Sequence, residues 1–301
     1  MANYLAISGT TGFLGSYCTK HLEVFGLSHT PINLRMPLPE KLSDEVTVVM
    51  HLAGKAHDLK KVAGPEEYFQ VNTELTKRLF EVFLRSEACI FIYVSSVKAI
   101  ADSVQGDTLL ESDDPQPLTP YGKSKLAAEQ YLQTQILPEG KQLYILRPCM
   151  IHGPGNKGNL NLLYKLVKKG IPWPLGAFEN KRSFLSVDNF CFVIDEILGG
   201  SLPPGVYNLA DSEPLATNEV ICIIAAGMGK RAAIWSIPKS WMSLIAKMGD
   251  VFRLPLNTER LQKLTENYVV SNQKLVEALG KPLPVEARLG MMKTIKSFEK
   301  S

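Results

Sequence analysis

The sequence lacks the features that mark membrane, secreted or nucleic-acid-binding proteins. Its 33 basic and 30 acidic residues leave a formal net charge of only +3, too small to favour nucleic acid or an anionic membrane as a partner. No apolar run approaches the ~20 residues of a transmembrane helix. The N-terminus has no basic segment, and its apolar run is too short for a signal peptide. We therefore expect a cytoplasmic protein without membrane insertion.

Cysteine and histidine are also sparse and scattered. The five cysteines form no C-x-x-C pair, and the five histidines show no metal-ligand spacing. Four of the cysteines lie in apolar sequence, which predicts buried free thiols in a reducing compartment rather than disulfides. No metal site is expected. The cysteines are Cys18, Cys89, Cys149, Cys191 and Cys222.

Strand and helix patterns alternate through the first half of the chain. Short apolar runs predict buried strands, and amphipathic helices follow most of them. This alternation predicts an α/β fold, a Rossmann-type doubly wound parallel sheet with helices on both faces. The expected strands are 4–8, 31–35, 46–54 with its turn, 89–94 and 142–147; the expected helices begin near 13, 66 and 120.

Three glycines follow the first strand and open the first helix. Gly9 permits a tight turn, Gly12 lets a pyrophosphate approach the backbone N–H groups, and Gly15 allows close packing of helix on strand. Their spacing is a variant of G-x-G-x-x-G, and its position between strand and helix indicates a dinucleotide site.

Two further residues bear on that cofactor. The second strand ends without an acidic residue but with Arg35, which slightly favours NADP over NAD because an arginine accommodates a 2′-phosphate. A solvated surface arginine is the alternative. Asn72 lies within the apolar side of the helix expected over 66–85, where a polar side chain needs a partner. It either ties two strands together or lies near the cofactor.

The segment from Thr119 to Lys125 predicts a helix that carries reactive groups. Thr119 suits the N-cap and Pro120 the first helical position. Tyr121 and Lys125 are four residues apart and lie on one face, so we expect the lysine to lower the tyrosine pKa. A tyrosine tuned in this way exchanges a proton with an alcohol or ketone. Ser95 and Ser96 end a strand and should converge with Gly54 at the carboxyl edge of the sheet.

The composition changes after about residue 150. A Gly-rich loop, a helix over 160–169, an alternating strand at 181–188 with Asp188 as a possible helix cap, and a strand at 205–209 precede a helical remainder. We expect residues 1–150 to form the NAD(P)-binding domain and 151–301 a smaller, mostly helical substrate lid, with segments near 180–210 returning to the sheet. Lys157, Arg182 and Arg260 suit a diphosphate, although solvated surface charge is the alternative for each.

Five motifs in this order resemble the extended short-chain dehydrogenase/reductases, the NAD-dependent epimerase/dehydratase family. The resemblance covers nearly the whole chain and implies Ser96, Tyr121 and Lys125 as the catalytic set, with Ser95 as second choice for the hydroxyl. It also implies NAD(P) as cofactor and a homodimer formed through helices 66–86 and 120–136. The motifs are Gly9-Thr10-Thr11-Gly12-Phe13-Leu14-Gly15, His51-Leu52-Ala53-Gly54, Val94-Ser95-Ser96, Tyr121-Gly122-Lys123-Ser124-Lys125, and Leu146-Arg147-Pro148 with His152-Gly153-Pro154-Gly155.

The resemblance extends to contacts with the ligands. Residues 146–189 and 269–280 are similar to a bacterial subgroup of nucleotide-sugar 4-epimerases and 4-keto reductases, which implies that Asn159, Arg182 and Arg260 contact a UDP group. The implied cofactor-binding residues are Gly9, Gly12, Phe13, Leu14, Gly15, Arg35, Leu52, Ala53, Gly54, Asn72, Ser95, Tyr121, Lys125 and Pro148.

The chain departs from the family pattern in two places. Only 35 residues lie between Gly15 and His51, so the third strand and its acidic adenine contact are shortened or lost. Val97-Lys98 stands where the dehydratases have Asp-Glu, which argues against dehydration. We expect 4-keto reduction of a UDP-6-deoxy-hexosamine for surface polysaccharide. A UDP-hexose 4-epimerase is the alternative, and a non-catalytic cofactor-sensing protein a distant one.

Overall fold

The structure, a computed structural model, describes residues 4–55, 64–104, 106–156, 158–252, 254 and 256–299, apart from the side chain of Asn159. Six parallel strands form the central sheet in the order β2–β1–β3–β4–β5–β9, which confirms the predicted fold class. The strand order reverses between β1 and β3, where ligands of such sheets bind. The strands are β1 (Tyr4–Ser8), β2 (Ser28–Ile32), β3 (Val48–His51), β4 (Ile90–Val94), β5 (Gln142–Pro148) and β9 (Gly205–Leu209).

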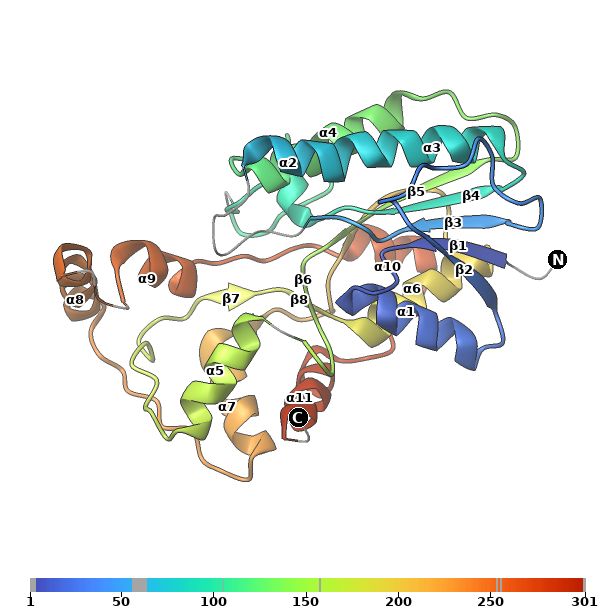
Figure 1. Cartoon of the computed structure of the whole chain (residues 1–301). Coiled ribbons are helices and arrows are strands. Elements are labelled where there is room, and N and C mark those ends of the chain that lie inside the picture. The colour runs from blue at the N-terminus through green and yellow to red at the C-terminus, as the bar shows by residue number, and fades with distance from the viewer. Residues whose placement is uncertain are drawn as a thin grey trace.

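Helices cover both faces of this sheet (Figure 1). One face carries α2, α3 and α4, and the other carries α1, α6 and α10. Strands buried on both faces need continuous apolar sequence, and β3 and β4 have it. These helices are α1 (Phe13–Val24), α2 (Pro65–Phe69), α3 (Leu75–Arg85), α4 (Pro120–Thr134), α6 (Val187–Leu198) and α10 (Gln273–Leu279).

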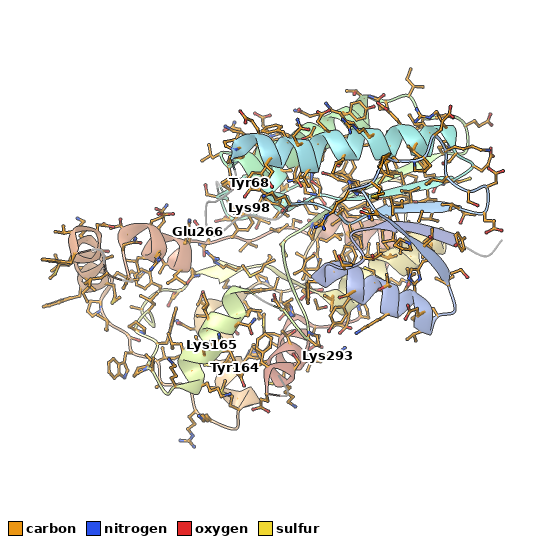
Figure 2. The ribbon with its side chains drawn as sticks, viewed as in Figure 1. Tyr68, Lys98, Tyr164, Lys165, Glu266 and Lys293 are labelled. Carbon is orange, nitrogen blue, oxygen red and sulfur yellow. The ribbon has the colours of Figure 1, made fainter. Side chains whose placement is uncertain are left out.

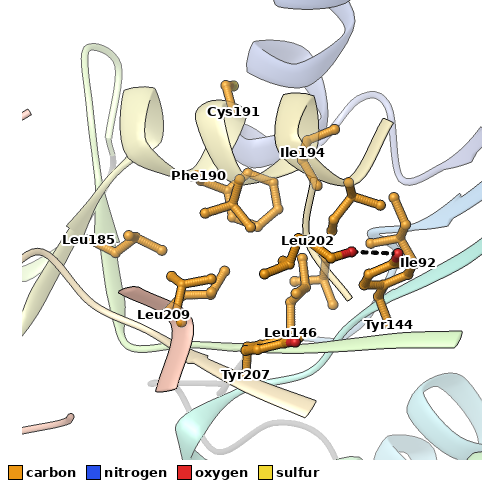
Figure 3. Packing of buried hydrophobic residues seen from close by; sticks show 14 of the residues in the cluster. Ile92, Tyr144, Leu146, Leu185, Phe190, Cys191, Ile194, Leu202, Tyr207 and Leu209 are labelled. Atoms are coloured by element: carbon orange, nitrogen blue, oxygen red, sulfur yellow. Dashed lines mark hydrogen bonds between the residues drawn. The ribbon is translucent and has the colours of Figure 1, made fainter. Parts of the chain in front are cut away.

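The core beneath the sheet joins the two halves of the chain. Phe190 of α6 packs among Leu146, Leu202 and Leu209, as Figure 3 shows. The hydroxyl of Tyr144 donates a hydrogen bond of 2.8 Å to the Leu202 carbonyl, which satisfies a polar group inside this apolar cluster.

A smaller lobe lies against the carboxyl edge of the sheet. It has its own apolar core, which includes Trp173, Leu215, Ile224 and Met291. Two short strand pairs, β6 with β8 and β7 with β10, form small sheets separate from the central one. The elements of this lobe are β6 (Met150–His152), α5 (Asn159–Lys168), β7 (Lys181–Arg182), β8 (Phe184–Ser186), β10 (Leu215–Ala216), α7 (Thr217–Gly227), α8 (Lys239–Phe252), α9 (Thr258–Thr265) and α11 (Ala287–Phe298).

Several local predictions are corrected by the structure. The second strand begins at Ser28 and ends at Ile32, because residues 33–36 form a turn in which the side chain of Asn33 accepts from the backbone N–H of Arg35. The helix expected over 66–85 is interrupted by a π-helical turn, Gln70–Glu74, between α2 and α3. Ser186 caps α6 rather than Asp188, which lies in the first turn.

The cysteine prediction is only partly correct. All five are free, but Cys89 and Cys222 are exposed, whereas Cys18, Cys149 and Cys191 are buried. Among the described helices, none has both the length and the apolar content that crossing a bilayer requires. Within the same residues, no group of three His, Cys, Asp or Glu side chains is arranged to hold a metal ion.

Candidate active site

The glycine turn after β1 lies at the point where the strand order reverses. Gly9 has φ +79°, and an added Cβ there would lie 2.6 Å from the Ala53 backbone nitrogen. A Cβ at Gly15 would collide with the carbonyl of Gly9. α1 begins with Phe13 and Leu14, and its N-cap residue, Gly12, has no side chain to accept from the N–H groups of the first turn, which lie at the positive end of the helix. The turn therefore has the shape and the donors that a pyrophosphate requires.

A chain of buried hydrogen bonds runs from this turn into the next helix. Ser8 Oγ lies 2.6 Å from His51 Nδ1, and His51 Nε2 lies 2.9 Å from Thr76 Oγ1. Thr76 donates to the Asn72 carbonyl at 2.7 Å, and Ser8 Oγ accepts from the Ala53 N–H at 3.3 Å. Burial and the nearby ammonium of Lys125 lower the His51 pKa to about 3, so the ring is neutral. This network was not predicted from the sequence, although polar residues inside apolar strand and helix patterns were its signal.

Asn72 lies in the π-helical turn and is fully enclosed. Its amide oxygen accepts from the Lys55 N–H at 2.7 Å, and its amide nitrogen donates to Ser124 Oγ at 3.0 Å. It thus ties the turn after β3 to α4, rather than tying two strands together. A Cβ at Gly54 would lie 3.1 Å from the Asn72 amide oxygen, which places this residue at the edge of the expected cofactor site. π-turns within α-helices are frequent at functional sites.

The side chains of Tyr121 and Ser96 lie close enough to interact in the same region. Thr119 caps α4 by accepting from the Gly122 N–H at 3.2 Å, as the sequence predicts, and Pro120 begins the helix. The ring of Tyr68 meets that of Tyr121 edge-on, with centroids 6.4 Å apart. The prediction of a lowered Tyr121 pKa is wrong for the free protein. Burial raises it, and only the hydrogen bond with Ser96 acts in the opposite direction.

Lys125 does not direct its ammonium at Tyr121. It donates to the Val94 carbonyl at 2.9 Å, lies over the Tyr93 ring and sits 3.1 Å from where a Gly54 Cβ would be. Burial lowers its pKa to about 8, partly offset by the Glu129 carboxylate. The ammonium group of Lys125 is thus held near the place where the turn after β1 meets the turn after β3.

Ser95 has a different environment from Ser96. Its hydroxyl donates to Glu129, whose carboxylate also accepts from the Arg147 guanidinium, with Nε–Oε2 2.9 Å. All three side chains are buried. A buried ion pair of this kind fixes α4 against β4 and β5. The cofactor contact expected of Ser95 stays a prediction, as does that of Pro148 at the end of β5.

The sheet has few strands on the side where the adenosine of a cofactor is expected. Among the described residues β2 is the outermost strand, and the chain returns through turns to β3 without a further strand beyond it. Arg35 is exposed just after β2. Its side chain is therefore accessible to a ligand that occupies the end of this strand.

A basic cluster lies between α4 and the smaller lobe. Figure 2 shows Lys98 between Tyr68 and Glu266 along this boundary. Lys98 Nζ donates to the Asp102 carbonyl at 2.7 Å and lies 4.1 Å from the centroid of the Tyr268 ring. Burial lowers its pKa, and the charge of Arg182 acts in the same direction. The sequence comparison with the dehydratases predicted only that Lys98 replaces an acidic residue, and no role was predicted for it as a cation two residues after Ser96.

Arg182 is the other cation of this cluster. It donates to the Lys263 carbonyl and, at 3.1 Å, to Glu266 Oε1, which fastens β7 to the end of α9. Its Nε is buried and has no hydrogen-bond partner in the described part of the chain. Arg260 lies one helical turn before Lys263 on the exposed side of α9. The side chain of Asn159 and the whole of Lys157 lie outside the described residues.

Comparisons with known proteins agree with this geometry. The NAD dependent epimerase/dehydratase family matches residues 5–210. UDP-glucose 4-epimerase of Vibrio cholerae is 27% identical over 325 positions, covering 99% of this chain and 96% of the relative. The N-acetyl-alpha-D-glucosaminyl-diphospho-ditrans,octacis-undecaprenol 4-epimerase of Escherichia coli O157:H7 is 28% identical over 207 positions, 67% of this chain and 60% of the relative. The solved structure of RMD from Pseudomonas aeruginosa complexed with NADPH superposes with a TM-score of 0.71 at 20% identity, covering 99% and 100% of the two chains.

The family match extends from β1 to the residue after β9. It therefore includes the glycine turn, Ser96, Tyr121 and Lys125 in one continuous alignment. This confirms the resemblance drawn from the motifs and the prediction of an NAD-dependent enzyme. The chain belongs to the NAD-dependent epimerase/dehydratase family.

Proposed function

We propose that this enzyme reduces the 4-keto group of a UDP-linked 6-deoxy-hexosamine, with NADPH or NADH as the hydride source. The observation that carries the proposal is that the side chains of Ser96 and Tyr121 lie within reach of each other, close to the buried ammonium of Lys125. Ketone reduction requires a proton donor at the carbonyl oxygen, and the raised pKa of Tyr121 keeps its phenol protonated. Ser96 holds this hydroxyl in position.

Other residues would bind and orient the cofactor. When bound, the nicotinamide group supplies the hydride, and the protein supplies orientation and electrostatics. The uncapped turn at Gly9, Gly12 and Gly15 would hold the pyrophosphate, and Lys125 the nicotinamide ribose. The first turn of α1 fits this role because it has N–H donors that the side chain of its N-cap residue, Gly12, does not use.

The short edge of the sheet supports a cofactor that exchanges at every turnover. A reductase must release its oxidised cofactor, whereas an epimerase retains the same nicotinamide through both half-reactions. The absence of a described strand beyond β2, together with exposed Arg35, supports a loosely held cofactor with a 2′-phosphate.

The basic cluster supports a diphosphate-linked sugar as substrate. Arg182 has a buried Nε without a hydrogen-bond partner among the described residues, and its charge acts on Lys98, which lies on the path from Ser96 to α9. Guanidinium groups match phosphate oxygens in geometry and charge. The Vibrio relative is named for a UDP-linked sugar and the E. coli relative for a sugar on undecaprenyl diphosphate, so the diphosphate is the feature they share.

The test is a spectrophotometric assay of the purified protein. With a UDP-4-keto-6-deoxy-hexosamine we expect stoichiometric consumption of NADPH, and a preparation that contains little bound cofactor. Parallel reactions with dTDP- and polyprenyl-diphosphate-linked sugars identify the carrier. No NADPH consumption with any 4-keto sugar would refute the reductase assignment.

A C4 epimerase is the second candidate. It is favoured by the Vibrio relative, an epimerase that aligns over nearly the whole chain. In that case the protein would retain NAD through purification and interconvert C4 epimers of a sugar diphosphate without added cofactor.

A further inference from the structure

Helix α8 presents an apolar face to solvent. Eight of the eighteen exposed large hydrophobic side chains in the described part of the chain lie between residues 235 and 254. Those on α8 recur at spacings of three and four residues, so they share one side of the helix. They are Trp241, Leu244, Ile245, Met248, Val251 and Phe252, with exposed fractions from 40% to 76%.

The opposite side of α8 is firmly attached to the protein. Met242, Ala246 and Gly249 are buried, and a Cβ at Gly249 would collide with the Leu256 carbonyl. The Asp250 carboxylate accepts from the hydroxyl of Thr258 at 2.7 Å, which joins α8 to the start of α9. The apolar face is therefore fixed outward, and only something outside the described chain can cover it.

The charges around this face indicate the chemistry of its partner. Residues 228–252 include four basic side chains and one acidic side chain, and the acidic one is Asp250, which is bonded to Thr258. Lys239 and Lys247 lie on α8 itself, and both are exposed. The net charge of +3 gave no reason to expect an anionic partner, but the positive charge is concentrated here.

We propose that α8 docks this protein on the surface of an anionic phospholipid bilayer. A helix of 14 residues is too short to span the apolar core, but its length suits a position in the plane of the interface. Apolar side chains enter the acyl boundary, Trp241 lies at the headgroup level, and the lysines meet anionic headgroups.

Docking in this orientation affects the candidate active site. α8 and α9 lie together at one end of the molecule (Figure 1), and Arg182 bonds to the Lys263 carbonyl of α9. The bilayer would therefore adjoin the end of the enzyme from which Arg182 and Arg260 are reached. This proposal does not depend on the reductase assignment, because it rests on the surface of α8 alone.

Vesicle co-sedimentation tests the proposal with the full-length protein. One set of vesicles contains phosphatidylethanolamine and phosphatidylglycerol, and the other contains phosphatidylcholine only. Tryptophan fluorescence gives a second readout, since Trp235 and Trp241 are exposed whereas Trp173, the third, is buried. We expect binding to the anionic vesicles with a blue shift of the emission, and little binding to phosphatidylcholine.

Two variants assign this binding to α8. Met248→Ser with Phe252→Ser should weaken vesicle binding by roughly tenfold or more, because both apolar anchors are removed while both tryptophans stay. Lys239→Gln with Lys247→Gln should weaken binding to anionic vesicles by roughly tenfold, from the loss of two headgroup contacts. Leu289→Ser, on α11, is the control, since Leu289 is 63% exposed and lies outside the α8 surface.

The proposal is overturned if the wild-type protein does not bind anionic vesicles, or if the control weakens binding as much as the α8 variants. A second copy of the chain would replace the bilayer as the occupant if sizing chromatography shows a dimer that Met248→Ser with Phe252→Ser dissociates. Unchanged thermal unfolding of all variants shows that folding is intact.

Discussion

The ammonium group of Lys125 donates a hydrogen bond of 2.9 Å to the carbonyl of Val94, at the end of the strand that leads to Ser96. This carbonyl belongs to the last residue of β4. Burial of the ammonium lowers its pKa to about 8. A buried, charged group with a pKa lowered in this way marks a candidate functional position.

Replacing this lysine should stabilise the free protein. At pH 7, Lys125→Met should raise the free energy of unfolding by about 1–3 kcal/mol. Removal of the buried charge contributes about 1.4 kcal/mol for each unit by which the lysine pKa is lowered, and loss of the hydrogen bond to Val94 offsets part of this gain. The folded-state pKa lies below the unfolded one, so the penalty is complete below pH 8 and disappears as the pH rises toward 10.5. Denaturant titrations at pH 7 and 9.5 should show the gain shrinking; a gain independent of pH would contradict this explanation.

Tyr121→Phe removes the proposed proton donor. We expect the turnover rate to fall by about 10²–10⁴-fold, the usual contribution of general acid catalysis, with cofactor affinity nearly unchanged. Tyr131→Phe on the same helix is the matched control, since its hydroxyl donates to Glu81 on the exposed side of the helix. Turnover close to that of the wild type in Tyr121→Phe would eliminate the assignment.

His51 should make folding sensitive to acid. Its pKa is about 3 in the folded protein, below the ordinary 6.5, so the unfolded state binds the proton first. His51 therefore has no effect on the pH dependence of the free energy of unfolding above pH 6.5. As the pH drops from 6.5 toward 3, this free energy falls by up to about 1.4 kcal/mol per pH unit because of His51. Unfolding titrations between pH 4 and 7 should show a shallower slope for His51→Gln. His29→Gln, at a position outside the buried network, is the matched control.

Lys98→Met tests whether the basic cluster faces the substrate. Methionine retains most of the apolar volume of the lysine but removes its charge. If Lys98 contributes to diphosphate binding, the dissociation constant for UDP should rise about tenfold while that for NADPH stays the same. Calorimetry measures both. Lys123→Met, at an exposed position on α4, should change neither; equal weakening of UDP and NADPH binding would indicate a general structural effect instead.

Arg35→Ala tests the cofactor phosphate. Removal of a guanidinium at the end of β2 should weaken NADPH binding by about 5–30-fold, the range expected for one charged hydrogen bond, and leave NADH binding unchanged. Lys41→Ala removes a positive charge from the same connection and serves as the control. Equal affinities of the Arg35→Ala variant and the wild type for NADPH would place the phosphate elsewhere.

The sequence by itself determined the sheet and the elements that carry the candidate site. Apolar runs followed by glycine or serine marked β1, β3 and β4, and Thr119 with Pro120 marked the start of α4, because these signals are local. The spacing of Tyr121 and Lys125 was visible, but their electrostatics were not. A pKa depends on burial and on where a flexible side chain points, and neither is encoded in spacing along a helix.

Only the tertiary structure decided which polar residues work together. Ser8, His51, Thr76 and Asn72 come from four elements and form one network because the sheet order places β1 beside β3. The same holds for Lys98 and Arg182, which are distant in the sequence and adjacent across the boundary between the sheet and the smaller lobe. The face of α8 was apolar in the sequence, but its exposure depended on which side of the helix packs on α9. Long-range contacts of this kind follow from packing the whole chain, so no local pattern specifies them.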